Sequence, residues 1–541
     1  MRNIIKYLLV LMAVPTVLSG CLQEEVPYNG SATADQIGES AEALEAANQA
    51  VTAWLNESMS ISGEHWDFGY PTIALAMDAL TCDVAVNEYG YDSGALNWRV
   101  AGGALSDTGN LPDYVWMFFY RQIMLANNTL ISLNSEGDGS DVDELSANAK
   151  SAVGQMLAFR GMAYLMLSRI FEYKGELSGA FVGLTVPYID QHTTESEARN
   201  NPRVAHNEMY NDVIVRDLTN ALEYLDGYKR SDKTEIDQSV VYGLLARTYL
   251  TMEEWSKAAE AARKAIDLSG AKLLTESQWT DSATGFNSMS APSWMWAVHM
   301  TSDDDVVQTG ICNWASFMAS EATFGYCGTS NAASAKCIDA ALYAKIPDTD
   351  WRKQSWLDPD RSKFEYQLAQ SEAWAESVYD YTNIKFRPGN GNTSEYLVGA
   401  VVDFPMMRVE EMYLIEAEAK AMGGNASEGK TLLETFAKTR NSAYVCAASD
   451  AKGIQDEIFL QRQIELWGEG HIVFDYKRLN KPQLRGYTGT NHFKECRYNS
   501  PNGNAPWTTL PIPYDETITN LVLASQQNPL PIDSRGKLWE E

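Results

Sequence analysis

Cationic side chains are scarce in this sequence compared with anionic ones. Its 541 residues include 42 Lys and Arg against 72 Asp and Glu, which gives a formal net charge of -30. Such an acidic excess repels phosphate backbones and anionic lipid head groups, and so disfavours nucleic-acid binding through a basic surface. The chain is still 45% hydrophobic, enough for a packed core. We expect a folded protein whose ligand is neutral or cationic.

Histidine and cysteine are also few, and their spacing argues against a metal site. The six His are scattered, and no Cys has CxxC spacing with Cys or His partners, so we predict neither a metal nor a cofactor. Residues 303–305 are three Asp without EF-hand spacing, so a structural calcium ion is not indicated. Beyond Cys21, we expect free buried thiols, with the closest candidates for a disulfide being Cys312, Cys327 and Cys337.

No hydrophobic run is long enough to cross a bilayer, which takes about 20 residues. The first run, residues 7–18, is uncharged for 12 residues and follows Arg2 and Lys6, the pattern of a secretion signal. It ends Leu-Ser-Gly-Cys21, which resembles the lipobox of bacterial lipoproteins. We therefore predict a signal peptide over residues 1–20, acylation of Cys21 and a lipid-anchored linker over residues 21–39. The acidic residues just after Cys21 resemble a lipoprotein surface-export signal.

Helical periodicity dominates both flanks of the chain. It predicts helices over residues 40–56, 114–133, 149–173 and 208–225. Residues 240–268 have the small-residue spacing of a tetratricopeptide helix pair, and residues 407–422 and 427–441 form a second pair in which Ala417 and Gly429 repeat that spacing. Such pairs bury their apolar faces only by stacking on neighbours. The sequence thus predicts a mostly α fold, an irregular bundle of helix pairs.

The middle of the chain is different. Residues 271–404 are rich in Gly, Ser and Asn and contain 7 of the 15 Trp, and residues 294–298 alternate as a strand does. We predict a single domain over residues 40–541, with a helix-pair scaffold at about 40–270 and 405–480. The same interpretation gives a loop-rich insertion with short strands at about 271–404 and an extended C-terminal segment at 481–541. Loops held by a rigid scaffold commonly carry binding sites.

A motif near the C-terminus gives the clearest family resemblance. It reads Arg462-Gln-Ile-Glu465-Leu-Trp-Gly468-Glu469-Gly470 and continues to Asp475 and Arg478. This run resembles the signature of the SusD/RagB-like outer-membrane nutrient-binding lipoproteins. Residues 116–130, 405–419 and 511–513 resemble other segments of that family, in the same order. His471 stands where the family often has Arg, a local departure from the pattern.

The resemblance implies a SusD-like fold with four tetratricopeptide-like helix pairs packed against an irregular ligand-binding half. It also implies a protein anchored by acyl chains in the outer membrane and facing the cell exterior. There, family members cover a TonB-dependent SusC-like transporter and deliver glycans, or in some members peptides, to it. They are not enzymes.

The motif itself has a structural explanation. Glu465 and Glu469 are i,i+4 neighbours on a helix, Gly468 and Gly470 let the chain turn out of it, and Arg462 or Arg478 can pair with the carboxylates. The sequence has no GxSxG, HExxH or P-loop motif, so we assign no catalytic residue. A lipid-anchored glycoside hydrolase is the less favoured alternative, because that chemistry needs only two suitably spaced carboxylates.

Two stretches combine aromatic planes with the Asp, Asn and Arg that bind sugars. They are residues 65–99 and 313–326. By residue type, the candidate ligand-binding residues are Trp66, Asp78, Tyr89, Tyr91, Trp98, Arg99, Trp314, Phe317 and Tyr326. Core packing competes with binding for each aromatic. We expect Tyr89, Tyr91 and Trp98 to be exposed, followed by Trp314. The leading hypothesis is capture of an oligosaccharide, and capture of a peptide remains open as the alternative.

Overall fold

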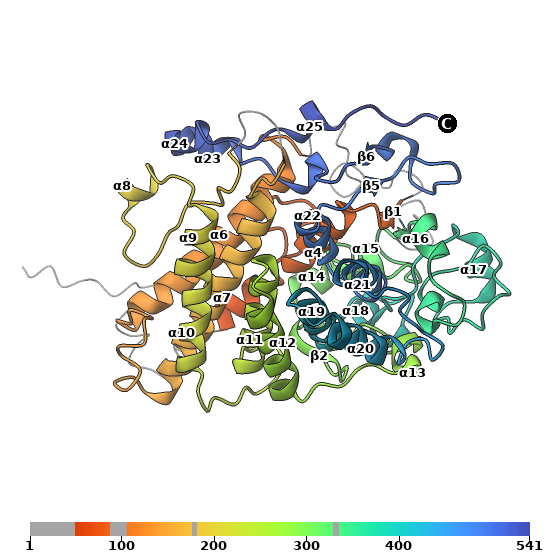
Figure 1. The fold of residues 1–541 in the computed structure, drawn as a ribbon, viewed down its shortest axis with the longest axis horizontal. Helices are drawn as coiled ribbons and strands as arrows, with labels where there is room; N and C mark the ends of the chain where they lie inside the picture. Colours follow the sequence, from red (N-terminus) through yellow and green to blue (C-terminus); the bar gives the residue numbers. More distant parts are fainter. Residues whose placement is uncertain (1–48, 87–104, 176–180, 328–334) are drawn as a thin grey trace, which may run out of the picture.

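The computed structural model describes residues 49–86, 105–175, 181–327 and 335–541, and about half of these residues are helical (Figure 1). The long helices are α4 (Tyr70–Ala79), α6 (Asn110–Ser132), α7 (Ala147–Phe171), α10 (Arg216–Tyr224), α11 (Gln238–Thr251), α12 (Trp255–Ser269), α19 (Val409–Met422), α20 (Ala426–Ala437), α21 (Ala451–Glu465) and α22 (Ile472–Arg478). Short helical pieces include α8 (Glu195–Ala198), α9 (His206–Glu208), α13 (Glu276–Thr280), α14 (Asp305–Gln308), α15 (Trp314–Met318), α16 (Ala340–Ala344), α17 (Glu372–Ser377), α18 (Tyr396–Gly399), α23 (Tyr514–Thr519), α24 (Leu521–Ala524) and α25 (Pro531–Ser534). The predicted mostly α fold is confirmed.

The long helices pack as neighbours in chain order. α6 lies on α7, α7 on α10, α11 on α12, and α12 on α19, which in turn contacts α20 and α21 (Figure 1). The helices predicted from residue 114 to 268 and from 407 to 441 are all present, with ends shifted by a few residues. One differs in detail, because residues 209–215 form a π-helical turn between α9 and α10. Residues 40–48 of the first predicted helix lie outside the described residues.

The strands are short and form two-stranded antiparallel pairs. They are β1 (Val84–Ala85) with β3 (Cys337–Ile338), β2 (Trp294–Val298) with β4 (Phe404–Arg408), and β5 (Gln483–Leu484) with β6 (Asn499–Ser500). The predicted strand over residues 294–298 is therefore confirmed. Every residue of β2 and β4 is buried, so this pair lies inside the molecule.

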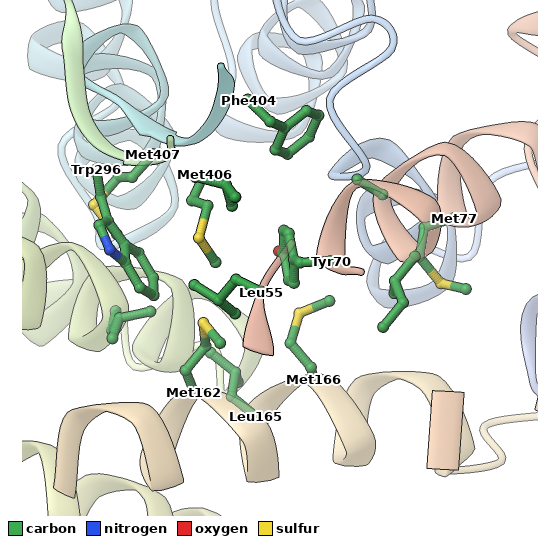
Figure 2. Close-up of a cluster of buried hydrophobic side chains, with 14 of the residues drawn as sticks. Leu55, Tyr70, Met77, Met162, Leu165, Met166, Trp296, Phe404, Met406 and Met407 are labelled. Carbon is green, nitrogen blue, oxygen red and sulfur yellow. The ribbon is translucent and has the colours of Figure 1, made fainter. Parts of the chain in front are cut away.

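The helices and the β2–β4 pair meet in one apolar core. Figure 2 shows Tyr70 of α4, Met162 and Met166 of α7, Trp296 of β2 and Met406 of β4 pointing toward one another. Each of these side chains is at most 4% exposed. Full burial of one such side chain contributes roughly 1.5–3 kcal/mol to folding. The core therefore joins the helical scaffold to the loop-rich middle of the chain.

No disulfide joins the six cysteines of the described chain, and all but Cys82 are buried. No described helix has the length and apolarity needed to span a bilayer. The single-domain division of residues 40–541 stays a prediction.

The contact between α19 and α20 depends on a glycine. A Cβ at Gly429 would lie 2.6 Å from the Ala417 carbonyl oxygen and 2.6 Å from the Ala421 amide nitrogen. Both atoms are backbone, so the helices would have to move apart.

We predict that Gly429→Ala lowers the free energy of unfolding by about 1–3 kcal/mol, although Ala is the better helix former. Urea unfolding measures this. The control is Ser427→Ala at an exposed position of α20, which should change stability by less than about 0.5 kcal/mol. Equal stabilities for the two variants would contradict the close helix contact.

Candidate functional site

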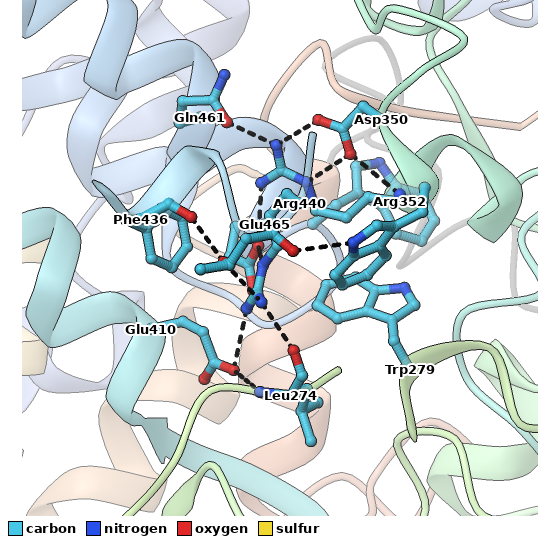
Figure 3. A network of polar contacts seen from close by, with 12 residues as sticks. Leu274, Trp279, Asp350, Arg352, Glu410, Phe436, Arg440, Gln461 and Glu465 are labelled. Atoms are coloured by element: carbon cyan, nitrogen blue, oxygen red, sulfur yellow. Dashed lines mark hydrogen bonds and ion pairs between the residues drawn. The ribbon is translucent and has the colours of Figure 1, made fainter. Parts of the chain in front are cut away.

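The signature motif forms a buried cluster of charges where α21 ends. Glu465 accepts hydrogen bonds from Arg352 at 2.9 Å and from Arg440 at 3.1 Å, and lies 3.3 Å from an Arg408 nitrogen (Figure 3). Arg352 also pairs with Asp350 at 2.7 Å. Burial opposes ionisation of Glu465, but the three arginines hold the pKa of its carboxyl well below the usual range.

A second carboxylate extends this cluster. Glu469 accepts from Arg408 Nε and from Lys385 Nζ, both at 2.7 Å, and Arg408 also pairs with Glu410 at 2.9 Å. All of these side chains are buried. Four cations thus face four carboxylates. They are Arg352, Lys385, Arg408 and Arg440 with Asp350, Glu410, Glu465 and Glu469.

The two signature arginines lie beside this cluster and share a different carboxylate. Asp475 accepts from Arg462 at 2.6 Å and pairs with Arg478 at 2.7 Å. Arg462 and Arg478 therefore do pair with a signature carboxylate, but not with Glu465 or Glu469. The partners of those two glutamates come from residues 352, 385, 408 and 440, which no local sequence pattern identifies.

Both signature glycines have the backbone geometry that the turn requires. Gly468 and Gly470 each have φ near +82°. A Cβ at Gly470 would lie 2.5 Å from the Cα of Ala74, so this turn packs directly against α4. The next residue, His471, is buried near Arg247 and Glu411, and burial lowers its pKa to about 4, although Glu411 acts in the opposite direction. His471 is consequently neutral at pH 7.

The two stretches predicted to bind ligand lie side by side. His65 Nδ1 is 2.5 Å from the Tyr326 hydroxyl, and the rings of Phe68 and Phe317 stack with centroids 5.2 Å apart. Farther along the chain, β1 at residues 84–85 pairs with β3 at residues 337–338 and so brings neighbouring segments of both stretches together. Residues separated by about 250 positions thus form one region.

Several candidate residues are more buried in this region than their residue types suggested. Trp314, 1% exposed, packs edge-on against Phe386 and Phe404, so its predicted exposure is wrong. Phe317 is fully buried, and Trp66 and Tyr326 are 6% and 8% exposed. These rings line the interior because they fill the space between the two stretches.

Asp78 is buried in α4 and faces the turn at Gly470. Its pKa is raised to about 7, chiefly by burial; Asp83 and Glu469 act in the same direction, and the Gly470 amide and Lys385 oppose them. Cys21, Tyr89, Tyr91, Trp98 and Arg99 lie outside the described residues.

Exposed aromatic surface near this region comes from a residue that the sequence did not single out. Tyr396 of α18 is 39% exposed, and the neighbouring Phe324 is half-buried against Gly399, whose added Cβ would lie 2.7 Å from the Phe324 ring. A hydrogen bond from the Thr323 amide to the Thr393 carbonyl, 2.6 Å long, holds these segments together. Tyr396 lies in a Gly- and Asn-rich segment, residues 388–400, and such a composition is typical of an exposed loop. Among the described residues, no group of three or more His, Cys, Asp or Glu could hold a metal ion.

Loss of one charge from the cluster should be costly. Glu465→Gln leaves Arg352 and Arg440 buried without this carboxylate, so we predict that the free energy of unfolding falls by about 3–5 kcal/mol. Asp456→Asn on the same helix removes an exposed pair with Lys481 and should cost at most about 1 kcal/mol. Urea unfolding at pH 7 compares the two variants. Similar decreases in the free energy of unfolding would mean that the buried cluster contributes no more to stability than the exposed pair.

The buried carboxyl of Asp78 makes stability depend on pH. Its pKa is about 7 in the folded chain against 3.8 for an unperturbed aspartate side chain. A raised folded pKa contributes stability that is complete below about pH 4 and is lost as the pH rises through about 7. We predict that Asp78→Asn gains stability relative to the parent chain by up to about 4 kcal/mol between pH 4 and 8. The exposed control Asp533→Asn should show no such trend, and a pH-independent difference for Asp78→Asn would refute the assignment.

Family models match most of this chain. A model described as the SusD family matches residues 320–530, and one described as starch-binding associating with outer membrane matches residues 33–250. A comparison with curated proteins finds no match.

Solved structures share the fold along nearly the whole chain. A SusD-like carbohydrate binding protein from Bacteroides vulgatus ATCC 8482 is 23% identical with a TM-score of 0.70, over 91% of this chain and 99% of the other. A SusD superfamily protein from Bacteroides thetaiotaomicron VPI-5482 is 20% identical with a TM-score of 0.67, over 91% and 100%. A laminarin binding SusD-like protein is 19% identical with a TM-score of 0.60, over 90% and 98%. With two family models matched in order along one shared fold, this chain belongs to the SusD/RagB-like family.

Proposed function

We propose that this protein binds oligosaccharides at the cell surface and delivers them to a TonB-dependent SusC-like transporter in the outer membrane. Membership of the SusD/RagB-like family is the observation that carries this proposal. The description of one matched family model as starch-binding, and the laminarin binding relative, favour a glycan ligand. The same model's description supports outer-membrane association, and the lipobox-like sequence before Cys21 supports a lipid anchor.

The proposed ligand site lies where the described part of the first stretch, residues 65–86, meets residues 313–326, with Tyr396 beside Phe324 of the second stretch. The buried rings Trp66, Phe317 and Tyr326 form the base of this region. Tyr89, Tyr91 and Trp98 remain our candidates for stacking on a sugar, and Arg99 for hydrogen bonding. Neutral sugars suit this chain because a net charge of -30 does not repel them.

Capture without catalysis is part of the proposal. The glycan is bound and released unchanged, as expected for a family of binding proteins. Two carboxylates of the signature motif, Glu465 and Glu469, are already paired with buried Arg and Lys side chains, which supports a structural role for them.

The mature chain with Cys21→Ser can be titrated calorimetrically against plant, host-mucin and microbial oligosaccharides, with a peptide mixture beside them. We expect saturable binding of one glycan class and no cleavage products. Binding only to peptides would replace the glycan proposal, and product formation would indicate a hydrolase.

With that glycan, we predict that Tyr89→Ala, Tyr91→Ala and Trp98→Ala each weaken binding at least about five-fold, or ~1 kcal/mol, because a stacking plane is lost. Tyr396→Ala tests the neighbouring exposed ring in the same way. The control is Tyr514→Ala, an exposed ring on α23, 49% exposed, which should leave affinity unchanged. Unchanged affinity in all four test variants would mean that the glycan binds at another site on the protein.

A further inference from the structure

A cavity of about 370 Å³ lies between α6 and the segments that carry α8, α23 and α24, at the upper left of Figure 1. Its size falls within the usual range for small-molecule sites, about 300–1,000 Å³. The walls are mostly apolar and include Trp116, Met117, Tyr120, Met124 and Leu523. None of the candidate glycan-binding residues that the structure describes, Trp66, Asp78, Trp314, Phe317 and Tyr326, lines this cavity.

Some of its polar groups already serve the fold. The Tyr120 hydroxyl donates to the Pro187 carbonyl at 2.7 Å, and the Asn520 side-chain amide donates to the Asn201 carbonyl at 2.6 Å. These bonds fix α6 and α24 against the segment at residues 187–201. The charged groups of the wall, Glu516 and Arg121, therefore determine which ligand charge the cavity can accept.

Glu516 has an apolar setting and lacks a cationic partner within the described residues. Its carboxylate takes a hydrogen bond from the Trp116 side chain, and Asp113 and Asp515 are the charges that act on it. Burial raises the pKa of Glu516, and the two aspartates raise it further; burial and Asp515 likewise raise the pKa of Asp113. Three carboxylates thus stand together and repel one another.

Arg121 does not relieve this repulsion. Its guanidinium lies over the Trp54 ring, 4.5 Å from the ring centroid. On α6 it comes five residues after Trp116, which corresponds to roughly 7 Å along the helix axis. The wall therefore carries one carboxylate, Glu516, and one cation, Arg121. Asp113 and Asp515 act on Glu516 from outside the lining, so the charge around Glu516 is acidic.

We propose that this cavity binds an apolar amine: a primary ammonium group paired with Glu516 beside the Trp116 and Tyr120 rings, with its hydrocarbon body against Met117, Met124 and Leu523. An ammonium neutralises the like-charged carboxylates and is attracted to aromatic faces. The apolar walls provide the burial that a purely ionic contact lacks. The ammonium group can belong to a free amine or to the lysine side chain of a short peptide.

The test uses the mature chain with Cys21→Ser and two probes of nearly equal shape, phenethylamine and 2-phenylethanol. Calorimetry or ligand-observed NMR measures affinity. We expect the amine to bind at least tenfold more tightly than the alcohol. We also expect Glu516→Gln to remove that preference while leaving the alcohol unaffected. A second arm with acetyl-Leu-Lys-Leu-amide tells the sources apart: binding that depends on Glu516 assigns the ammonium to lysine, and its absence assigns it to a free amine.

Two further variants separate this effect from a general loss of structure. Met124→Arg places a cation at a rim position that is 50% exposed, and should weaken the amine at least five-fold without weakening the alcohol. Glu208→Gln, an exposed acid on α9, should change neither affinity. Equal binding of amine and alcohol, no saturable binding of either, or an unchanged preference in Glu516→Gln would overturn the proposal.

Discussion

The buried ion cluster around Glu465 and Glu469 is the constraint on which the arrangement of the other parts depends. Removing charges from water is expensive, and a buried ion is tolerated only when its partners are held in place. Arg408 reaches this cluster from β4, Arg440 follows α20, and Arg352 and Lys385 come from the loop-rich middle. Because every charge has an opposite neighbour, these ion pairs fix how the helical scaffold packs against the loop-rich insertion.

Hydrogen bonds also connect the signature region to the part of the chain that carries the proposed glycan site. The main-chain carbonyl of Asp83 accepts from the Trp467 indole at 2.9 Å, and its side chain accepts from Tyr476 at 2.7 Å and Gln463 at 2.9 Å. Asp83 directly precedes β1, which pairs with β3 beside the second ligand stretch. Residues of the signature region thus hold Asp83 in place, directly before the strand pair of β1 and β3.

The sequence was informative where the pattern is local and weak where it is distant. The 3.6-residue periodicity of α6, α7 and α11 and the alternation of β2 predicted those elements to within a few residues. The family motif identified Glu465 and Glu469, but their partners lie 25 to 113 positions away, at Arg440, Arg408, Lys385 and Arg352, and single basic residues carry no local signal. Trp314 was misjudged because residue type alone does not distinguish a ring that stacks on a ligand from one that packs in the core. Its burial depends on Phe386 and Phe404, which come to it only in the folded chain.

The hydrogen bonds between the two ends of the chain have a consequence for when the protein can complete its structure. Arg485 donates to the carbonyls of Ala79 and Thr81 across 406 and 404 positions, and Gln463 reaches Asp83 across 380. Closing so long a loop adds little thermodynamic cost, since each doubling of length costs only about 0.6 kcal/mol. The time at which these bonds can form is restricted, however, because α4 and β1 are synthesised early and their partners are synthesised last. During synthesis, α4 and β1 therefore lack these hydrogen bonds until nearly the whole chain has left the ribosome.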